Sequence, residues 1–526
     1  MRLPLAALLA ALASTAGAET LTILHTNDVH SRLEPVSRFN TTCSPDQVAE
    51  GACQGGAARL LAAINVARDE AGAVLLLDGG DQFQGSLMYT QYKGKAAAEV
   101  MNVLGYDAMA VGNHEFDDGP EVLRAFIDAV DFPVLMANAD VSAEPSLAGA
   151  VPPSVVLERG GHRYGLIGLA PADTHETSKP GPTVVFEDPV VALQREVARL
   201  EADGINRIIV LSHSGYSADK QFAAAVDGID VIIGGHSHTL LSNQVDGAAG
   251  PYPTWVTTPS GGRTAIVQAY AYARYLGRLE VAFDVKGLLT QASGEPIFLG
   301  PGSPEDPKLA ARVAALAEPL NALRQEVVAE ATAMIGADHG QCRARECTLG
   351  TMVADAMLAR VRRQGVEIAI QNGGGLRAPL PAGEITRGDV MEMLPFQNTL
   401  SLLSLTGADL RAALAHGISA VADGHGRFPQ VAGMRFAYDT SANGGTPRLG
   451  AVEVYRDGAW APLDDARTYD VVTNDFLRRG GDGYEVFAER AVRPYDFGPD
   501  LVDVVIDYLS RKRPYTPYTD GRIRVD

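Results

Sequence analysis

The sequence predicts an α/β fold with two large domains. Short β-rich runs alternate with helical stretches from Leu21 to about Asp284, which is typical of a layered α/β domain with buried strands. The chain has 526 residues. That is too long for one ordinary core, since about 150 residues per domain is a reasonable prior. A stretch rich in Pro and Gly at 301–307 separates this part from a second part of α+β character.

The first part alternates strands and helices in a regular order. The predicted strands are Leu21–Leu24, Val74–Leu77, Met109–Val111, Val134–Ala137, Tyr164–Leu169, Arg207–Leu211 and Val231–Ile233. The predicted helices between them are Ala57–Glu70, Ala96–Leu104, Glu121–Val130 and Val190–Glu201. Polar motifs follow several strands directly, and open α/β sheets place their sites at these carboxyl ends.

A helical stretch over Lys308–Ala329 follows the Pro- and Gly-rich break and is expected to connect the two parts. The second part is predicted to hold helices near Leu349–Arg363 and Ala408–His416, a strand near Glu367–Ile370 and several later strands. The predicted division is a signal peptide over residues 1–18, an α/β domain over 19–306, a helical linker over 307–326 and a C-terminal α+β domain over 327–526.

Charge limits the possible partners. The chain has 44 Lys and Arg against 64 Asp and Glu, a net charge of −20. This field opposes binding to nucleic acid or to an anionic membrane, so an anionic substrate must be attracted by local positive charge. No internal apolar stretch approaches the roughly 18 to 20 residues of a membrane span.

The first residues predict export. Arg2 precedes an apolar run from Leu3 to Ala13, and Ala16-Gly17-Ala18 is a small-residue cleavage site. The alternative is a short buried helix, which the A-x-A ending disfavours. No Cys follows the cleavage site to accept lipid, and the C-terminus is polar. We expect a periplasmic or secreted protein without a membrane anchor, and the oligomeric state stays open.

Four cysteines fit an oxidising compartment. Cys43 with Cys53 and Cys342 with Cys347 are the natural local pairs, although four cysteines allow three pairings. Neither spacing matches a C-x-x-C zinc or redox motif. Structural disulfides are therefore favoured over a metal site.

Five polar motifs at strand ends predict a metal centre. Asp28 and His30 are two apart in an extended segment and can turn towards one ion. Asp81 ends an Asp-Gly-Gly-Asp turn, where a carboxylate can bridge two cations. The other three motifs contribute Asn113, His213, and the pair His236 and His238. Each histidine alone is more often a satisfied structural residue, but five such motifs together are not explained that way.

The third motif also places His114 three residues before Asp117. The carboxylate can hold the imidazole in the state that protonates a leaving oxygen. The ligand set contains no thiolate, which suits Zn²⁺ or Mn²⁺. Two such ions would generate a hydroxide nucleophile, so the motifs predict metal-assisted hydrolysis.

The second domain carries residues suited to an organic anion. A glycine-rich turn from Asn372 to Arg377 follows a β-run and can offer backbone amides and a guanidinium. Phe396 and Phe476 provide flat rings for a nucleobase, although each ring alone is more often part of a core. Arg343 between Cys342 and Cys347, and Asp482 in a Gly-Gly-Asp-Gly turn, complete the candidate set.

The five metal motifs resemble those of the binuclear metallophosphoesterase superfamily, whose D-x-H, GD, GNH(E/D), H and GHxH blocks occur here in the same order. The resemblance implies one metal site of Asp28, His30, Asp81 and His238, and a second of Asp81, Asn113, His213 and His236. His238 departs from the nucleotidase branch, in which an amide residue is usual.

From Leu21 to the Gly-Gly-Asp-Gly turn, the chain resembles the 5′-nucleotidase family, which includes animal ecto-5′-nucleotidases and periplasmic bacterial UDP-sugar hydrolases. The resemblance implies that the phenylalanines stack on the base and that Asp482 binds the ribose. It also implies a rotating second domain, with the hinge near Lys308–Ala329. The implied nucleoside-binding set is Arg343, Asn372, Arg377, Phe396, Phe476 and Asp482.

The expected activity is hydrolysis of nucleoside 5′-monophosphates, AMP first among them, by a two-metal mechanism with His114 and Asp117 protonating the leaving group. Cleavage of UDP-sugars or NAD, and hydrolysis of 2′,3′-cyclic nucleotides, remain open. A thiosulfohydrolase of the same superfamily is a further alternative. Its chemistry does not need paired aromatic rings, so Phe396 and Phe476 disfavour it. A non-catalytic nucleotide-binding module is the alternative of a different class, and the complete ligand set argues against it.

Overall fold

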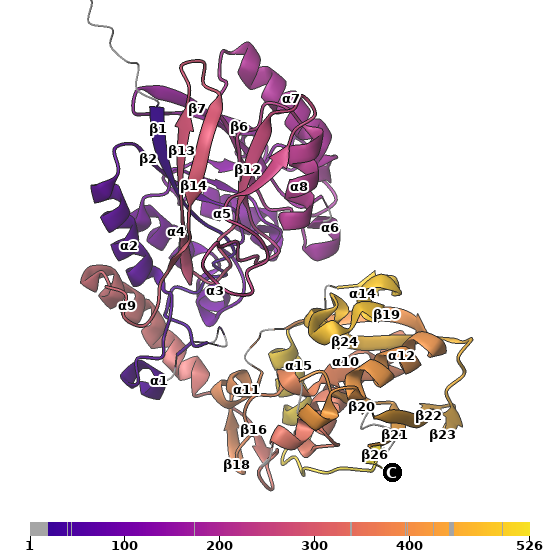
Figure 1. The fold of residues 1–526 in the computed structure, drawn as a ribbon. Helices are drawn as coiled ribbons and strands as arrows, with labels where there is room; N and C mark the ends of the chain where they lie inside the picture. Colours follow the sequence, from indigo (N-terminus) through magenta and orange to yellow (C-terminus); the bar gives the residue numbers. More distant parts are fainter. Residues whose placement is uncertain are drawn as a thin grey trace, which may run out of the picture.

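The computed structural model describes residues 19–525, apart from 39, 41, 44, 173, 337–338, 395, 397, 424–425, 441–446 and 497. The predicted signal peptide, 1–18, lies outside the described residues. Figure 1 shows two bodies joined near α9, and the predicted fold class of an α/β domain followed by an α+β domain is confirmed. Within the described ranges, no helix is both long enough and apolar enough to span a bilayer.

Two β-sheets form the centre of the N-terminal domain. The first has the order β14-β13-β1-β2-β3-β4, with β15 paired to β13, and the second has the order β11-β12-β10-β9-β7-β6. The strands of the first sheet are β1 (Glu19–Thr26), β2 (Val74–Asp78), β3 (Ala108–Ala110), β4 (Val134–Leu135), β13 (Tyr275–Phe283), β14 (Leu289–Gly294) and β15 (Ile297–Phe298). Those of the second are β6 (Ser154–Arg159), β7 (His162–Leu169), β9 (Ile208–Ser212), β10 (Val231–Gly234), β11 (Thr254–Thr257) and β12 (Arg263–Val267). A small separate sheet pairs β5 (Ala139–Asp140) with β8 (Val185–Phe186).

The alternation of side chains along the strands produces four layers. Leu21 and Ile23 of β1 share one core with Ile209 and Leu211 of β9, so the two sheets pack against each other. Leu24 points the other way, into a core with the helices that cover the first sheet. Those helices are α2 (Ala57–Glu70), α3 (Leu87–Tyr92), α4 (Lys95–Leu104), α5 (Pro120–Ile127) and α9 (Pro307–Arg324). The second sheet is covered by α7 (Pro189–Ala202) and α8 (Tyr216–Ala225), while α1 (Pro45–Ala49) and α6 (Thr174–Thr177) are short peripheral helices.

The connection between the domains differs from the predicted helix Lys308–Ala329. The helix α9 begins where Asp306 accepts hydrogen bonds from the backbone of its first turn, and it ends at Arg324. Val327–Ala331 is instead strand β16, paired antiparallel with β18 (Gly383–Thr386). Val327 and Val328 are β-branched and favour a strand, so the prediction that the helix continues to Ala329 is wrong. Apolar residues of α9 are buried in the core of the first domain, alongside α2 in Figure 1.

The C-terminal domain contains a sheet of order β20-β17-β24-β19-β25 and a smaller one of order β23-β22-β21-β26. The strands are β17 (Ile368–Asn372), β19 (Leu400–Thr406), β20 (Pro429–Ala432), β21 (Met434–Asp439), β22 (Arg448–Arg456), β23 (Ala459–Pro462), β24 (Thr468–Asn474), β25 (Val492–Tyr495) and β26 (Ile523–Val525). The helices are α10 (Thr348–Val361), α11 (Arg387–Met393), α12 (Gly407–Ile418), α13 (Asp475–Arg478), α14 (Glu485–Glu489) and α15 (Leu501–Ser510). Because β17 and β24 are parallel neighbours, their final residues meet at one edge of the sheet.

Both predicted disulfides are confirmed. Cys43 is bonded to Cys53 in the first domain, and Cys342 is bonded to Cys347 in the second. The second bond closes a loop that leads into α10.

Candidate active site

The five polar motifs converge after the carboxyl ends of β1, β2, β3, β9 and β10. Five of the predicted metal ligands have positive φ angles, which non-glycine residues rarely adopt. They are Asp28 (53°), His30 (50°), Asp81 (60°), His236 (70°) and His238 (48°). Such backbone strain costs about 1 to 3 kcal/mol per residue and gathers at functional sites. The strain therefore marks this edge of the two sheets as the functional region.

The first group of ligand atoms comprises Asp28, His30 and His238, all within 4.8 Å of one another. The Nε2 atoms of the two histidines face each other at 3.0 Å. Oδ1 of Asp28 lies 3.4 Å from Nε2 of His238 and 4.0 Å from Nε2 of His30. Two imidazole nitrogens and a carboxylate oxygen pointing at a common space form a suitable site for a divalent ion.

The second group comprises Asp81, His213 and His236. Oδ2 of Asp81 lies 2.8 Å from Nε2 of His213 and 3.9 Å from Nε2 of His30, so this carboxylate lies between the two groups. Nδ1 of His236 faces Oδ1 of Asn113 at 3.0 Å. The structure thus brings together all seven predicted metal ligands.

The outer nitrogens of two histidines are held by backbone carbonyls. Nδ1 of His30 lies 3.1 Å from the carbonyl of Phe83, and Nδ1 of His213 lies 2.6 Å from that of Gly79. A ring N–H donated to a carbonyl leaves Nε2 with a lone pair directed at the site, as is usual for metal-bound histidine. Nε2 of His213 is buried and faces Oδ2 of Asp81 at 2.8 Å. The donor set therefore fits divalent metal ions.

Electrostatics agree with this fit. Burial lowers the pKa of His30 and of His236 to about 3, so both rings are neutral, as a ligand must be. Burial would also lower the pKa of His213, but Asp81 and Asp28 outweigh it and raise the value to about 10. The carboxylates of Asp81 and Asp28 thus favour positive charge beside His213.

Glu115 ties two of the ligand loops together. Its fully buried carboxylate accepts hydrogen bonds from the backbone N–H groups of Asp81 at 3.0 Å and Gly112 at 2.7 Å, and from Gln82 and Phe83. Burial and the neighbouring Asp81 raise the pKa of Glu115 to about 7. The Glu115 side chain therefore holds the loop after β2 beside the loop after β3.

His114 lies next to the two ligand groups, with a ring nitrogen within 4.8 Å of ligand atoms of His30 and Asp81, and it is held by a carboxylate. Its Nδ1 is 2.7 Å from Oδ2 of Asp117, and its backbone N–H donates to Oδ1 of Asp81 at 3.0 Å. Burial lowers its pKa, but Asp117 and Asp81 outweigh this effect and raise it to about 9. Ser178 donates to Oδ1 of Asp117 at 2.7 Å. Ser178 was not predicted, because it lies 61 residues further along the chain with no local motif.

The candidate nucleoside-binding residues gather in the C-terminal domain. Nδ2 of Asn372 donates to Oδ2 of Asp482 at 2.8 Å, and the Arg377 guanidinium lies 5.8 Å from the centre of the Phe396 ring. Phe396 is 39% exposed and Phe476 is 44% exposed, so neither ring belongs to a core. Exposed rings of this size suit stacking on a flat ligand.

Arg343 is placed by the disulfide loop. A Cβ atom on Gly373 would lie 2.1 Å from the carbonyl of Cys342, so only glycine allows the glycine-rich turn to pack against this loop. Nε2 of Gln430 donates to the carbonyls of Cys342 and Arg345. The charge of Arg343 also contributes, after burial, to a lowered pKa of Arg377, so these two cations lie near each other.

Charged residues of the α13 segment act electrostatically on the candidate metal site. The charge of Arg479, just after α13, contributes to the lowered pKa of His236, after burial and the neighbouring His213. Asp475 of the same helix contributes to the raised pKa of Tyr272, whose ring lies 5.2 Å from that of His238. Phe476 is therefore on a segment whose charges act on His236 and on Tyr272, which lies beside His238.

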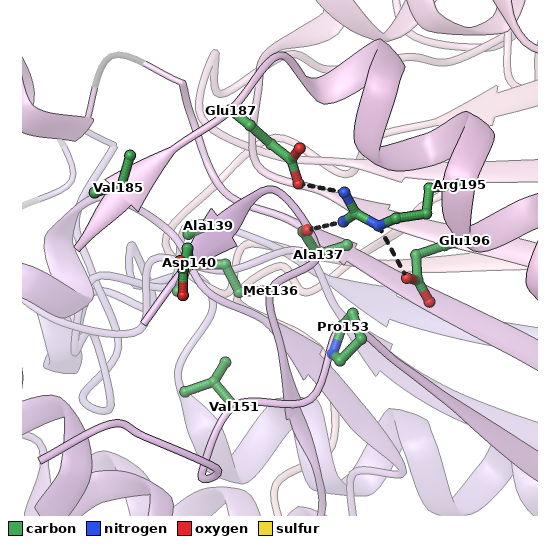
Figure 2. A pocket seen from close by; sticks show the side chains of 10 residues that line it. All are labelled: Met136, Ala137, Ala139, Asp140, Val151, Pro153, Val185, Glu187, Arg195 and Glu196. Atoms are coloured by element: carbon green, nitrogen blue, oxygen red, sulfur yellow. Dashed lines mark hydrogen bonds and ion pairs between the residues drawn. The ribbon is translucent and has the colours of Figure 1, made fainter. Parts of the chain in front are cut away.

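A separate cavity of about 460 Å³ lies elsewhere in the first domain (Figure 2). Arg195 lines it and is held by Glu187, Glu196 and the carbonyl of Ala137. Each of its three guanidinium nitrogens thus donates to a protein oxygen. None of the predicted site residues lines this cavity.

Comparisons with known proteins agree with this arrangement. Residues 21–240 match the calcineurin-like phosphoesterase family and residues 327–489 match the 5′-nucleotidase C-terminal domain. The chain is 38% identical to the 5′-nucleotidase of Bos taurus, over 96% of this chain and 90% of that protein. Among solved structures, the 5′-nucleotidase precursor from Thermus thermophilus is 43% identical, with a TM-score of 0.67 over 96% of this chain and 99% of that one. The NAD nucleotidase of Haemophilus influenzae is 27% identical, with a TM-score of 0.70 over 97% and 99%.

The near-complete coverage includes both domains and both candidate regions, and the similarity is not confined to the phosphoesterase half. The chain belongs to the 5′-nucleotidase family and is a phosphoric monoester hydrolase.

Proposed function

We propose that the protein is an exported 5′-nucleotidase that hydrolyses nucleoside 5′-monophosphates, AMP first among them, with two divalent ions, Zn²⁺ or Mn²⁺. The observation that carries this proposal is the position of Asp81 between two groups of ligand atoms, with His114 next to it. One ion would be held by Asp28, His30, Asp81 and His238, and the other by Asp81, Asn113, His213 and His236. Bound there, the ions supply activation of water and neutralisation of phosphoryl oxygens.

His114 then acts as the general acid. With Nδ1 held by Asp117, the remaining ring nitrogen, Nε2, carries the proton that passes to the leaving 5′ oxygen of the nucleoside. The carboxylates of Asp117 and Asp81 outweigh burial and raise the pKa of the ring, which favours its protonated form. Asp117, itself held by Ser178, fixes the ring orientation and stabilises its positive charge.

The nucleoside is bound by the second domain. The rings of Phe396 and Phe476 stack on the base and Asp482 accepts hydrogen bonds from the ribose. Arg343, Asn372 and Arg377 complete the set. Support comes from the exposure of both rings and from the Asn372–Asp482 hydrogen bond. Stacking of this kind contributes about 1 to 3 kcal/mol per base.

We assign the catalytic domain to residues 19–306, the linker to 307–326 and the substrate-binding domain to 327–526, with removal of residues 1–18 on export. Two disulfides support an oxidising compartment. Because α9 is packed into the first domain, rotation of the second domain would take place after Arg324.

A second candidate is cleavage of a dinucleotide such as NAD, favoured by the similarity to the NAD nucleotidase. Release of phosphate, or of the mononucleotide, from AMP, UDP-glucose and NAD in the presence of Mn²⁺ or Zn²⁺ distinguishes the two. We expect the highest kcat/KM with AMP. Cleavage of NAD without hydrolysis of AMP would favour the second candidate, and inactivity on all three would contradict both.

A further inference from the structure

A chain of side-chain hydrogen bonds runs beneath the Asp482 carboxylate. Oδ1 of Asn474 accepts the backbone N–H of Leu477 at 2.8 Å. Nδ2 of Asn474 lies 2.9 Å from Oε1 of Gln371 and 2.9 Å from Oδ1 of Asn372. Nδ2 of Asn372 in turn lies 2.8 Å from Oδ2 of Asp482. Three amide side chains, those of Asn474, Gln371 and Asn372, therefore connect a helix terminus to the predicted ribose-binding carboxylate.

The direction of donation along these hydrogen bonds is fixed at Asn474. A backbone N–H can only donate, so Asn474 must turn its oxygen towards Leu477 and its NH₂ group towards Gln371 and Asn372. Both atoms that receive this NH₂ group must then be oxygens. With its oxygen engaged there, Asn372 must turn its NH₂ group towards Asp482. Nε2 of Gln371 donates to the same Asn372 oxygen at 3.1 Å and reinforces this orientation.

Burial makes the arrangement costly to disturb. Gln371 and Asn474 are 0% exposed and Asn372 is 3% exposed. Asn372 ends β17 and Asn474 ends β24, and these strands are parallel neighbours. A buried amide that lost its partner would carry the full cost of desolvation, so the network has one favoured state.

The orientation of the Asp482 carboxylate depends on this favoured state of the network. Its backbone has a φ of 54°, and its carbonyl faces Nε2 of His416 at 2.9 Å, so the turn presents the side chain in one direction. One carboxylate oxygen takes the Asn372 N–H, and Oδ1 accepts no hydrogen bond from the described part of the chain. A reversed Asn372 would place an oxygen against the carboxylate and repel it.

We propose that Asn474 and Gln371 are positioning residues that set the direction of the Asn372 amide and thereby hold Asp482 ready to accept a sugar hydroxyl. This hydrogen-bond network makes the site around Asp482 selective for ligands with the hydroxyls of ribose over deoxy analogues. This inference rests on the proposed function, because it takes the pocket ligand to be a nucleoside.

The test uses Asn474→Asp in the full-length protein. An aspartate still accepts the Leu477 N–H, but it offers no donor to Gln371 and Asn372, so both amides should turn round. Gln371→Glu is a second variant, because it removes the Nε2 donor and sets a carboxylate oxygen against the two oxygens of Asn372, which opposes the native orientation of that amide. Thr473→Val is the matched control, because Thr473 is equally buried on β24 but donates to the carbonyl of Ile370, outside the network. Thermal unfolding confirms that each variant is folded.

Calorimetry measures binding of adenosine, 2′-deoxyadenosine and 3′-deoxyadenosine. The wild type and Thr473→Val are expected to bind at least one deoxynucleoside about tenfold more weakly than adenosine, as loss of a hydrogen bond to a carboxylate predicts. Asn474→Asp and Gln371→Glu should bind adenosine as weakly as that deoxynucleoside. If both variants keep the wild-type preference, or weaken all three ligands by one factor, the inference is overturned. Absence of nucleoside binding by the wild type would overturn the inference, whereas phosphate release from AMP tests the proposed function independently.

Discussion

The Nδ1 atom of His114 lies 2.7 Å from Oδ2 of Asp117, in a pair that neighbours the metal ligands without belonging to the seven predicted ones. Proton donation and metal binding are therefore assigned to different side chains. This separation allows the two contributions to be removed one at a time.

His114→Ala should lower kcat for AMP by roughly 10² to 10⁴, because the ribose oxygen is a poor leaving group and needs a proton. With p-nitrophenyl phosphate the loss should be much smaller, since that leaving group needs little protonation. Steady-state kinetics with both substrates, together with metal analysis of the variant, make the comparison. An unchanged kcat for AMP would remove His114 from the mechanism.

Ser178→Ala should lower kcat for AMP by about threefold to tenfold, because Asp117 loses the hydroxyl that holds its second oxygen. KM should change little. Ser178→Thr keeps a hydroxyl and serves as the control. An equal loss in both variants would indicate that the packing of this segment, and not the hydrogen bond, is responsible.

Phe476→Ala should raise KM for AMP, because stacking worth about 1 to 3 kcal/mol is removed from substrate and transition state alike. The rate with p-nitrophenyl phosphate should barely change. Equal damage to both substrates would show that the ring supports the fold and does not bind the base.

Asp230→Asn should change the pH dependence of stability. Burial raises the pKa of Asp230 to about 7, while its backbone partner Ile208 opposes the shift. The folded state therefore holds a proton that the unfolded state releases above about pH 4. Unfolding free energy then falls as pH rises towards 7, by at most about 1.4 kcal/mol per pH unit. The Asp230→Asn variant has no such loss. The difference in Tm, variant minus wild type, should therefore become more positive between about pH 5 and about pH 8. A constant difference in Tm would contradict this.

Much of the first domain was predictable because its central strands are buried on both faces. Such strands appear as short apolar runs that end in polar motifs, as at Ile208–Ser212 followed by His213. The helix Ala57–Glu70 also has the predicted bounds. Strands such as β11 and β14 were missed, because they are partly exposed antiparallel edge strands with no clear alternation.

Contacts between distant segments were not predictable. The Gly-Asn-His-Glu motif was recognised, but the role of Glu115 in joining two loops depends on β2 and β3 lying side by side. Likewise Gln371 and Asn474 are 103 residues apart and meet only because β17 and β24 are neighbours. Local pattern indicates which strand ends carry chemistry, and sheet order decides which of them touch.

Metal titration tests the central claim most directly. The protein is treated with chelator and dialysed, and AMP hydrolysis is measured as Mn²⁺ or Zn²⁺ is added back, with bound metal counted by elemental analysis. The account predicts loss of activity on chelation and full recovery at about two ions per chain, because Asp81 lies between two groups of ligands. Asp81→Asn should bind metal weakly and recover little activity. Full hydrolysis of AMP by a metal-free preparation would contradict the account.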